Sequence, residues 1–586
     1  MAKKLDKVEV VVVGAGWSGG IAAAELTKEG YEVVSLEKGK DRKLEDFIGS
    51  KDELRYYIRG EMMEDLQIST FTSRNTLEDE ALPVRSTENR WIGDGVGGSV
   101  VHWNGFTYRW LPSDFEIYTH TVDKYGEDKI PDYMTIKDWG ITYDELEPYY
   151  DKFEKTAGIS GEPSPLGPPR SNDYPNPPMK DNAVTRLFKE TTESMGYHPY
   201  QQPSANMSKQ YTNPDGETIN QCMYCSFCEK FGCDFGAKAD PISTVLSTAQ
   251  KTGRHELRTD CYVTEVLHED GKATGVLYRD LKTGEEIEQP ADMVVLAAYV
   301  FTNARILLLS EIGEPYDPET REGIIGKNFT GHFGSITYKG ARAYFDDTQY
   351  NYYAGAGALG AVIDDFNFDN IDNSEHDFLH GFEVHVKEFG GGPLTRGINV
   401  PEGTPGFGSE FKKNLIHYMS RNINVLSQSG GLPAYHNYFD LDPNYVDAFD
   451  IPVLRVTNHH TEQDYNLNKF ALEKCKEIAE ELGADIVDMD VLEEDVDFNH
   501  TFYSTHYGGG VIMGDSDEDS AVNTFSQMWD MENLFVVGSS VFPHFGNYNP
   551  TGTVGALAYR ATEGMLKYLS GDGGLLVESK SKVSKS

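Results

Sequence analysis

The sequence predicts an α/β fold that contains a parallel strand–helix–strand unit of the Rossmann type. Two observations near the N-terminus support this prediction. Residues 8–13 form a valine run that is interrupted only by Glu9, which is typical of a strand buried on both faces of a sheet. A glycine-rich turn, a helical stretch over residues 21–28 that Gly30 stops, and a second strand over residues 31–36 then follow in the order that a βαβ unit requires.

The glycine-rich turn has the spacing of a dinucleotide-binding site. Gly14 permits a tight turn, Gly16 lets the backbone approach a pyrophosphate, and Gly19 lets the helix pack closely on the strand. The N-terminus of the helix supplies amide donors for the phosphates. Glu37 stands at the end of the second strand, where a carboxylate can accept hydrogen bonds from ribose hydroxyls. These residues predict dinucleotide binding but do not distinguish FAD from NAD.

Composition excludes several other classes of protein. The chain has 586 residues with a formal net charge of −42, so its surface repels nucleic acid and a nucleic-acid partner is excluded. The most apolar stretch, residues 293–309, is interrupted by Asn303 and Arg305, so we expect no membrane-spanning helix. The N-terminus has no cleavable signal pattern. We therefore expect a cytoplasmic protein, or one that is exported or membrane-associated through a partner subunit.

Two further segments have clear local signals. Residues 161–180 contain seven prolines and predict an extended surface excursion. Residues 461–482 predict a helix, because Thr461 and Asp464 resemble a capping box and apolar residues recur at three- and four-residue steps. Cys475 lies on that apolar face, which predicts a core position.

Five more motifs follow the N-terminal unit. They are the glycine-rich loop RWIGDGVGGSVVHWNG (90–105), VVLAAYVFTNARILLLS (294–310), GKNFTGH (326–332), HYGGGVIMG (506–514) and NPTGT (549–553). In this order the motifs resemble those of the glucose–methanol–choline (GMC) oxidoreductase family. Within the family the chain is most similar to the flavoprotein large subunits of gluconate, fructose, sorbitol and glucose dehydrogenases, with pyranose oxidases as neighbours.

The resemblance implies a discontinuous FAD-binding domain of Rossmann-like α/β architecture and an α+β substrate domain with an antiparallel sheet that faces the flavin. In chain order, we expect a first FAD-binding segment over 1–115, an excursion with the first substrate-domain segment over 116–215, a second FAD-binding segment with a cysteine-rich stretch over 216–330, the main substrate domain over 331–499, a third FAD-binding segment with the catalytic loops over 500–570, and a flexible tail over 571–586.

The resemblance also implies roles for individual residues. Oxidation of an alcohol needs a base for the hydroxyl proton, and histidine suits that role because its ordinary pKa is about 6.5. His506 occupies the family's base position, and Asn549 that of a partner that holds the hydroxyl. The remaining cofactor contacts that the resemblance implies are Gly97, Gly98, His102 and Asn104 in the second glycine-rich loop, Val263, and Gly538, Ser539 and Thr551. His102 stands where some relatives bond a histidine covalently to the flavin and others hold it non-covalently, and both alternatives stay open.

Four of the six cysteines lie within twelve positions, at Cys222, Cys225, Cys228 and Cys233. Four thiolates so close together suit a soft metal ion or an iron–sulfur cluster. The spacing approaches that of bacterial ferredoxins without matching it, and Asp234 stands where those have a proline. Three interpretations remain: an iron–sulfur cluster, a zinc ion, or structural cysteines.

The sequence therefore predicts a FAD-dependent dehydrogenase that oxidises a hydroxyl of a sugar acid, sugar or polyol and passes electrons to a quinone or cytochrome. We also expect a small accessory subunit. Two alternatives are an FAD-dependent pyranose or glycoside oxidase that uses oxygen, and a non-catalytic electron-transfer subunit. The cysteine group argues against the oxidase, which needs no relay, and the intact His506 and Asn549 pair argues against a subunit without turnover.

Overall fold

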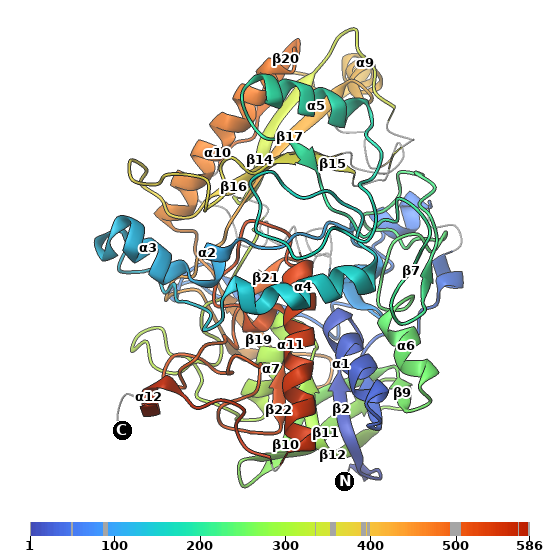
Figure 1. Ribbon diagram of the computed structural model, residues 1–586, viewed down its shortest axis with the longest axis vertical. Helices are drawn as coiled ribbons and strands as arrows, with labels where there is room; N and C mark the ends of the chain where they lie inside the picture. Colours follow the sequence, from blue (N-terminus) through green and yellow to red (C-terminus); the bar gives the residue numbers. More distant parts are fainter. Residues whose placement is uncertain are drawn as a thin grey trace.

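The protein places two large sheets at opposite ends of an elongated molecule (Figure 1). The computed structural model describes residues 2–47, 51–85, 92–333, 336–351, 355, 359–387, 394, 399–492, 505–571 and 573–583. Arg90 and Trp91 of the second glycine-rich motif lie outside the described residues, as do positions 493–504 at the expected boundary between the substrate domain and the last FAD-binding segment.

The lower half of Figure 1 contains an eight-stranded mixed sheet drawn from three distant segments of the chain. Its core is parallel: β12 pairs with β2 and β22, β2 pairs with β3, and β3 pairs with β9. The strands are β1 (Lys3–Lys4), β2 (Val8–Val13), β3 (Val33–Leu36), β9 (His255–Arg258), β10 (Cys261–Glu269), β11 (Lys272–Asp280), β12 (Glu286–Leu296) and β22 (Leu534–Val536). The discontinuous Rossmann-like region is therefore present.

The valine run of β2 separates two apolar cores. Val10 and Val12 pack with α1 (Trp17–Lys28) and α11 (Thr551–Ser570), whereas Val11 and Val13 belong to the core on the opposite side of the sheet. Because alternate side chains of a strand point to opposite faces, a strand that is covered on both sides has to be apolar throughout.

The upper half of Figure 1 contains a six-stranded antiparallel sheet in the order β20-β14-β17-β16-β15-β6. Its strands are β6 (Tyr200–Gln201), β14 (Tyr338–Tyr344), β15 (Gly360–Ile363), β16 (Phe382–Lys387), β17 (Asn422–Ser429) and β20 (Ile486–Met489). Helices α5 (Ala183–Ser194) and α10 (Glu462–Glu481) cover one face and share an apolar core with it. This is the antiparallel sheet that the resemblance implied.

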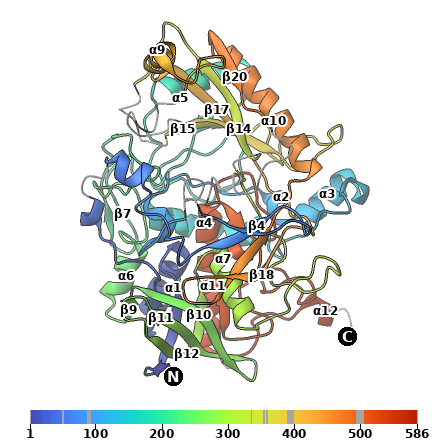
Figure 2. The same ribbon diagram turned by 180° about the vertical axis from the view of Figure 1, so that it is seen from behind.

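Smaller elements connect the two sheets, and the view from behind in Figure 2 shows β4 and β18 on that side. One further sheet contains β18 (Tyr438–Val446), β19 (Pro452–Thr457), β4 (Phe71–Arg74) and β5 (Leu82–Pro83). Two short ribbons are β7 (Tyr211–Thr212) with β8 (Thr218–Ile219), and β13 (Thr330–Gly331) with β21 (Tyr507–Gly508). The remaining α-helices of the described residues are α2 (Pro112–Phe115), α3 (Ile117–Tyr125), α4 (Tyr143–Ala157), α6 (Val245–Lys251), α7 (Val300–Leu309), α9 (Gly408–Tyr418) and α12 (Lys580–Val583). Shorter 3-10 and π helices are η1 (Leu44–Phe47), η2 (Leu54–Ile58), η3 (Gly98–Val101), η4 (Glu127–Lys129) and η6 (Ser539–Val541).

Most local predictions agree with the structure, and the differences concern the start of α1, the start of β3, which is Val33 rather than residue 31, and the C-terminal segment. Thr461 caps α10 through the predicted capping box with Asp464, and Cys475 is fully buried. However, α1 begins at Trp17, directly after the glycine turn, four residues before the predicted start. The C-terminal segment, expected to be flexible, is attached to the body: the Ser579 hydroxyl donates to Asp517 Oδ1 (2.6 Å), and the Leu576 N–H donates to Gln527 Oε1 (2.9 Å). No helix among the described residues has the length and apolar character needed to cross a membrane.

Candidate functional site

A large cavity opens where the central parallel strands of the mixed sheet end. Val13, Leu36 and Ala297 line it at the ends of three neighbouring strands. Twelve of the predicted site residues also line it: Gly14, Gly16, Glu37, Gly97, Gly98, Asn104, Val263, His506, Gly538, Ser539, Asn549 and Thr551. Residues from five separate segments therefore converge on one cavity, as expected for a site at the carboxyl edge of a parallel sheet.

The first glycine turn has room for a ligand at only one of its glycines. A Cβ atom on Gly14 or Gly19 would lie 2.5 Å or 2.0 Å from a backbone oxygen, so protein packing itself excludes a side chain at both positions. A Cβ atom on Gly16 would meet no protein atom within 4 Å, although Gly16 caps α1 and lines the cavity. The space above Gly16 is therefore open to a ligand at the N-terminus of the helix.

Glu37 lies beside this turn at the end of β3. Its carboxylate accepts hydrogen bonds from the backbone N–H groups of Ala15 (3.0 Å) and Gly39 (2.9 Å). Burial raises the pKa of Glu37, and these two hydrogen bonds partly oppose that rise. The carboxylate is thus held at the rim of the cavity by backbone donors.

The second glycine-rich loop packs directly against the first. The Gly97 N–H donates to the Ala15 carbonyl (2.9 Å), and a Cβ atom on Gly98 would lie 3.6 Å from the Gly16 Cα. His102 follows on this loop and is buried, but it is not among the residues that line the cavity. Gly93, which does line the cavity, lies next to its ring: a Cβ atom there would be 2.8 Å from His102 Cε1.

His506 and Asn549 both line the cavity and lie beside each other. Asn549 Nδ2 lies 3.3 Å from His506 Nε2, and Asn549 Oδ1 accepts from Gln428 Nε2 (3.4 Å). Gln428 comes from β17 of the antiparallel sheet and also donates to the Asn547 carbonyl (2.6 Å). The amide of Asn549 is therefore oriented with its nitrogen toward the histidine.

A second histidine fixes the protonation of the His506 ring. The ladder between β13 and β21 places His332 beside His506, with their Nδ1 atoms 3.0 Å apart. His332 Nε2 lies 2.8 Å from the Gly546 carbonyl, which can only accept, so Nε2 carries the proton. Burial lowers the pKa of His332 to about 3, so the ring is neutral and its Nδ1 has a lone pair. His506 Nδ1 then donates to His332, and His506 Nε2 keeps its lone pair on the Asn549 side.

The charge state of His506 follows from the same surroundings. Burial lowers the pKa of His506 well below its ordinary value, and the nearby His332 and Lys387 act in the same direction. A neutral histidine with an unprotonated Nε2 is the form that can remove a proton at neutral pH. The arrangement is thus competent for general-base chemistry in the cavity.

The four clustered cysteines lie behind the second glycine-rich loop. Cys228 Sγ is 3.6 Å from Asn206 Oδ1, and Asn206 Nδ2 donates to the Asn104 carbonyl (3.1 Å). The buried Lys238 ammonium donates to the carbonyls of Trp103 (2.6 Å) and Cys228 (2.9 Å), which ties the cysteine segment to the same loop.

The sulfur atoms are close enough to influence one another. Burial raises the pKa of Cys222 to about 11, and the charges of Cys233 and Cys225 add to that rise. None of the six cysteines forms a disulfide bond. Within the described residues, no three cysteine sulfurs lie within 4.8 Å of one another. In a tetrahedral zinc site with Zn–S bonds of about 2.3 Å, the sulfur atoms lie closer together than this. The arrangement therefore disfavours the zinc interpretation.

Comparison with known proteins agrees with this geometry. Two family models for GMC oxidoreductases match residues 136–334 and 433–558. The gluconate 2-dehydrogenase flavoprotein of Pantoea cypripedii is 38% identical, with 98% of this chain and 96% of that protein aligned. The chain belongs to the GMC oxidoreductase family. It is therefore an oxidoreductase that acts on CH–OH donors.

Two other similar proteins are more distant. The fructose dehydrogenase large subunit of Gluconobacter japonicus is 23% identical, with 97% of this chain and 99% of that protein covered. The solved structure of pyridoxine 4-oxidase from Mesorbium loti superposes with a TM-score of 0.57 at 17% identity, covering 95% of this chain and 99% of that one. This second likeness supports the fold, including the Rossmann-like region and the antiparallel sheet.

GMC oxidoreductases bind FAD, and the cavity fits that cofactor. The open space at Gly16 lies at the N-terminus of α1, where backbone donors suit a pyrophosphate. Thr551, the first residue of α11, also lines the cavity and adds a second helix N-terminus. Glu37 lines the cavity with a buried carboxylate at the end of β3, and His506 and Asn549 line it with further polar groups.

Two residues that contact His506 and Asn549 could not be recognised as site residues from the sequence. His332 belongs to a recognised motif, but nothing in the motif indicates that its ring contacts a residue 174 positions away. Gln428 lies in the strand NINVLSQS and had no signal of function, because a polar residue in an alternating strand is usually a solvent-facing one.

Proposed function

We propose that the protein is a FAD-dependent dehydrogenase, similar to gluconate 2-dehydrogenase, that oxidises a hydroxyl of a sugar acid, sugar or polyol. The observation that carries the proposal is the chain from the Gly546 carbonyl through His332 to His506, which keeps the His506 Nε2 lone pair in the cofactor cavity. When bound, FAD supplies the hydride acceptor at its N5 atom.

The residues around that lone pair have complementary roles. His506 Nε2 removes the hydroxyl proton of the substrate, while the Asn549 amide holds the hydroxyl oxygen. As the O–H bond breaks, its electron pair forms the carbonyl, and the neighbouring C–H bond breaks with departure of a hydride. His332 stabilises the imidazolium that forms, because His506 Nδ1 already donates to it (3.0 Å).

Buried polar side chains on the antiparallel sheet favour a substrate with many hydroxyls. Glu383 of β16 lies opposite Gln428 of β17, the residue that holds Asn549. Glu383 Oε2 and both side-chain polar atoms of Asn547 are buried without a hydrogen-bond partner among the described residues. Buried polar atoms of this kind are costly unless a ligand or water satisfies them. The hydroxyls of a sugar would do so.

An anaerobic spectrum before and after addition of single sugars tests the proposal. Gluconate, fructose, glucose and sorbitol form the first panel, and loss of the flavin absorbance is the expected result with at least one of them. His506→Ala should keep FAD but reduce it roughly 10²–10⁴-fold more slowly, because a general base is lost. A wild-type flavin that no sugar, sugar acid or polyol reduces would exclude the proposed activity and favour a non-catalytic subunit. Stoichiometric peroxide in air would favour the oxidase alternative.

We also propose that the cysteine segment holds an iron–sulfur cluster that carries electrons from the flavin toward a cytochrome or quinone. The links from Asn104 and Trp103 to Cys228 support this role, because they place the segment directly behind the loop that lines the cofactor cavity. A thiol whose pKa is raised by burial ionises at neutral pH when iron binds it. Iron and acid-labile sulfide should therefore be present in anaerobically prepared protein, and their absence would make the cysteines structural.

Covalent attachment of the flavin through His102 stays a prediction with a direct test. After acid precipitation, covalent FAD would remain with the protein pellet, and His102→Ala would release it. A colourless pellet from the wild-type protein would establish non-covalent binding. The contacts of Gly97 and Gly98 with the first glycine turn are compatible with either result.

A small accessory subunit is the partner that we propose. The relative from Gluconobacter japonicus is named a large subunit, which supports an assembly with further chains. Affinity purification of the tagged chain from cells of its native source should recover a stable small partner. Isolation of this chain alone would contradict the proposed accessory subunit but would not affect the proposed chemistry.

A further inference from the structure

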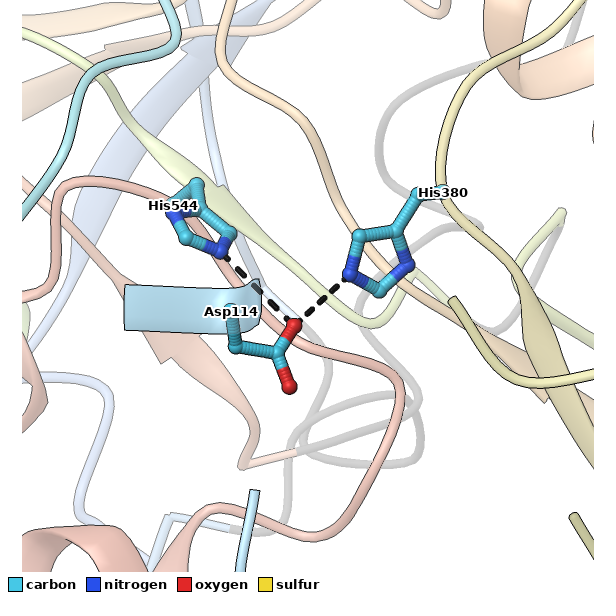
Figure 3. A group of neighbouring side chains, drawn as sticks. All are labelled: Asp114, His380 and His544. Atoms are coloured by element: carbon cyan, nitrogen blue, oxygen red, sulfur yellow. Dashed lines mark hydrogen bonds and ion pairs between the residues drawn. The ribbon is translucent and has the colours of Figure 1, made fainter. Parts of the chain in front are cut away.

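A buried carboxylate connects the catalytic loop with the antiparallel sheet. Asp114 of α2 lies between His380 and His544, and all three side chains are completely buried (Figure 3). Asp114 Oδ1 is 2.8 Å from His380 Nε2 and 3.9 Å from His544 Nε2. Asp114 Oδ2 accepts from the Leu111 N–H (2.9 Å). The carboxylate thus accepts from the Leu111 N–H and contacts His380 Nε2 at hydrogen-bond distance, while His544 Nε2 faces it from farther away.

Two histidines and a carboxylate also suit a divalent metal ion, but one hydrogen bond argues against a metal here. Trp139 Nε1 donates to His544 Nδ1 (3.1 Å), and an indole nitrogen can only donate. His544 Nδ1 therefore has a lone pair, and Nε2 of the neutral ring carries the proton. A metal-bound histidine instead binds the metal with one nitrogen and donates the proton on its other nitrogen to an acceptor. Trp139 cannot be that acceptor, because its indole nitrogen only donates.

The carboxylate is negatively charged in this setting. Burial alone would raise the pKa of Asp114, but the contacts with His380 and His544 outweigh it and lower that pKa to about 2. The buried charge thus depends on both histidines, and removal of a partner from such a group is strongly destabilising.

Each histidine leads into a different region of the active site. His380 lies two residues before β16, the strand that carries Glu383 and His385 on the face toward Gln428. His544 begins the loop 544–549. The Gly546 carbonyl of that loop accepts from His332, and its Asn549 contacts His506.

The loop is also packed tightly against Asp114. A Cβ atom on Gly546 would lie 3.2 Å from Asp114 Oδ1 and 2.9 Å from the Trp110 ring. On its other side, Phe545 exchanges two backbone hydrogen bonds with Gly431, just beyond β17 (2.8 and 2.9 Å). The loop 544–549 therefore lies between the carboxylate and the sheet.

From this placement we propose that Asp114 is a positioning residue that sets the separation between β16 and the loop 544–549 through His380 and His544. The separation matters because β16 carries polar groups for the substrate, whereas the loop carries Asn549 and the carbonyl that orients His332. The role rests on the proposed function, in which both sides act on one sugar.

Asp114→Asn is the informative variant because it changes the shape of the side chain very little. An amide has one acceptor oxygen, and its NH2 group would face at least one of the donors from Leu111, His380 and His544. The loop or β16 must then shift. A displacement of about 1 Å can cost about 10²-fold in rate when reacting groups are held in a fixed geometry.

Asp442→Asn is the matched control. Asp442 is a buried carboxylate of β18 that accepts from the Thr72 hydroxyl (2.6 Å) and from the N–H groups of Asn444 (2.8 Å) and Tyr445 (3.0 Å). Both variants remove one buried charge, but only Asp114 contacts the side chains that lead to β16 and the catalytic loop.

Anaerobic stopped-flow reduction of the FAD-loaded enzyme separates a positioning role from a structural one, since the rate constant does not depend on the active fraction. We expect Asp114→Asn to keep FAD and to lower the limiting reduction rate 10–100-fold, with a smaller change in the sugar concentration for half-saturation. Asp442→Asn should lower the Tm but leave the rate constant unchanged. A wild-type rate in Asp114→Asn, or an equal loss in both variants, would overturn the proposal.

Crystal structures of the wild type and Asp114→Asn test the positioning role even if no sugar reduces the flavin. The expected result is a displacement of residues 544–549 relative to β16 in the variant. An unchanged separation would overturn the inference, whereas failure of the sugar panel alone would overturn only the proposed function. Stoichiometric zinc or iron that the wild type holds and Asp114→Asn loses would also overturn it, in favour of a metal site.

Discussion

At the scale of single residues, the neutral His332 determines which nitrogen of His506 can act as a base. A carboxylate in the same place would also accept from His506 Nδ1, but it would favour the protonated ring and raise its pKa. With a neutral partner and a buried environment, the pKa of His506 is lowered instead. The ring is therefore neutral across the neutral pH range, with its proton on Nδ1 and its lone pair on Nε2.

Substitution of His332 tests this role. Glutamine can accept from His506 Nδ1 with its oxygen and donate to the Gly546 carbonyl with its nitrogen, whereas leucine can do neither. We expect His332→Leu to keep FAD and to reduce it on the order of 10²-fold more slowly, and His332→Gln to recover much of the rate. Stopped-flow reduction with the best sugar measures both. Equal rates in the two variants would show that His332 only fills space.

The pH dependence of flavin reduction follows from the sign of the His506 shift. Because the pKa of His506 is lowered, the base loses its function only after the pH falls well below 6.5, and the rate should be constant from about pH 8 to 6.5. Lys387→Gln removes a positive charge that lowers this pKa, so the acid limb should move to higher pH. Rates measured from pH 4 to 8, with the Tm recorded at each pH, check this. A limb that stays in place in Lys387→Gln would contradict the assignment.

At the scale of elements, the turn between β2 and α1 contains glycines that are needed for different reasons. Gly16→Val places a side chain in the open space where no protein atom lies within 4 Å, so we expect a folded protein with little bound FAD. Gly19→Ala places a Cβ atom 2.0 Å from the Gly14 oxygen, so we expect a large loss of thermal stability even before cofactor binding is considered. Flavin content and the Tm of the apoprotein distinguish the two. Normal flavin content in Gly16→Val would refute the location of the pyrophosphate.

The same elements show how much could be predicted from the sequence. The βαβ unit is local, and its strand and turn signals lie within 30 residues, so β2, α1 and β3 were predicted with errors only at their ends. The helix α1 began earlier than expected because Ser18 and Gly19 are poor helix formers that tertiary packing nevertheless holds in the first turn. The capping box of α10 was equally local.

Contacts between segments that are distant in the sequence could not be predicted from it. His332 meets His506 only because β13 pairs with β21, a ladder of two residues per strand that leaves almost no pattern in the sequence. Asp114 meets His380 across 266 positions, and neither belongs to a motif. A buried polar group is recognisable only when its partners are known, so this connection could be found only from the structure.

At the scale of the whole molecule, the chain combines a cofactor cavity, a polar sheet face and a cysteine segment around one loop. The sheet face meets the cavity at Asn549 through Gln428, beside His506, where we propose that the substrate reacts. The cysteine segment lies on the other side of the second glycine-rich loop, through Asn206 and Lys238. In the proposed function, electrons therefore enter from the substrate on one side of this loop and leave toward an acceptor on the other.

This separation predicts that the two half-reactions can be damaged independently. Cys225→Ser and Cys228→Ser should leave reduction of the flavin by sugar intact, because neither cysteine contacts His506 or Asn549 in the described structure. The same variants should slow transfer to a one-electron acceptor such as a cytochrome, since the proposed cluster would pass the two electrons of the flavin to it one at a time. Cys475→Ser is the control, because Cys475 is buried in α10 against the antiparallel sheet.

Stopped-flow reduction followed by mixing with oxidised cytochrome c measures both half-reactions in one experiment. If Cys228→Ser transfers electrons as fast as the wild type and Cys475→Ser, the cysteine segment is structural and electrons leave the flavin directly.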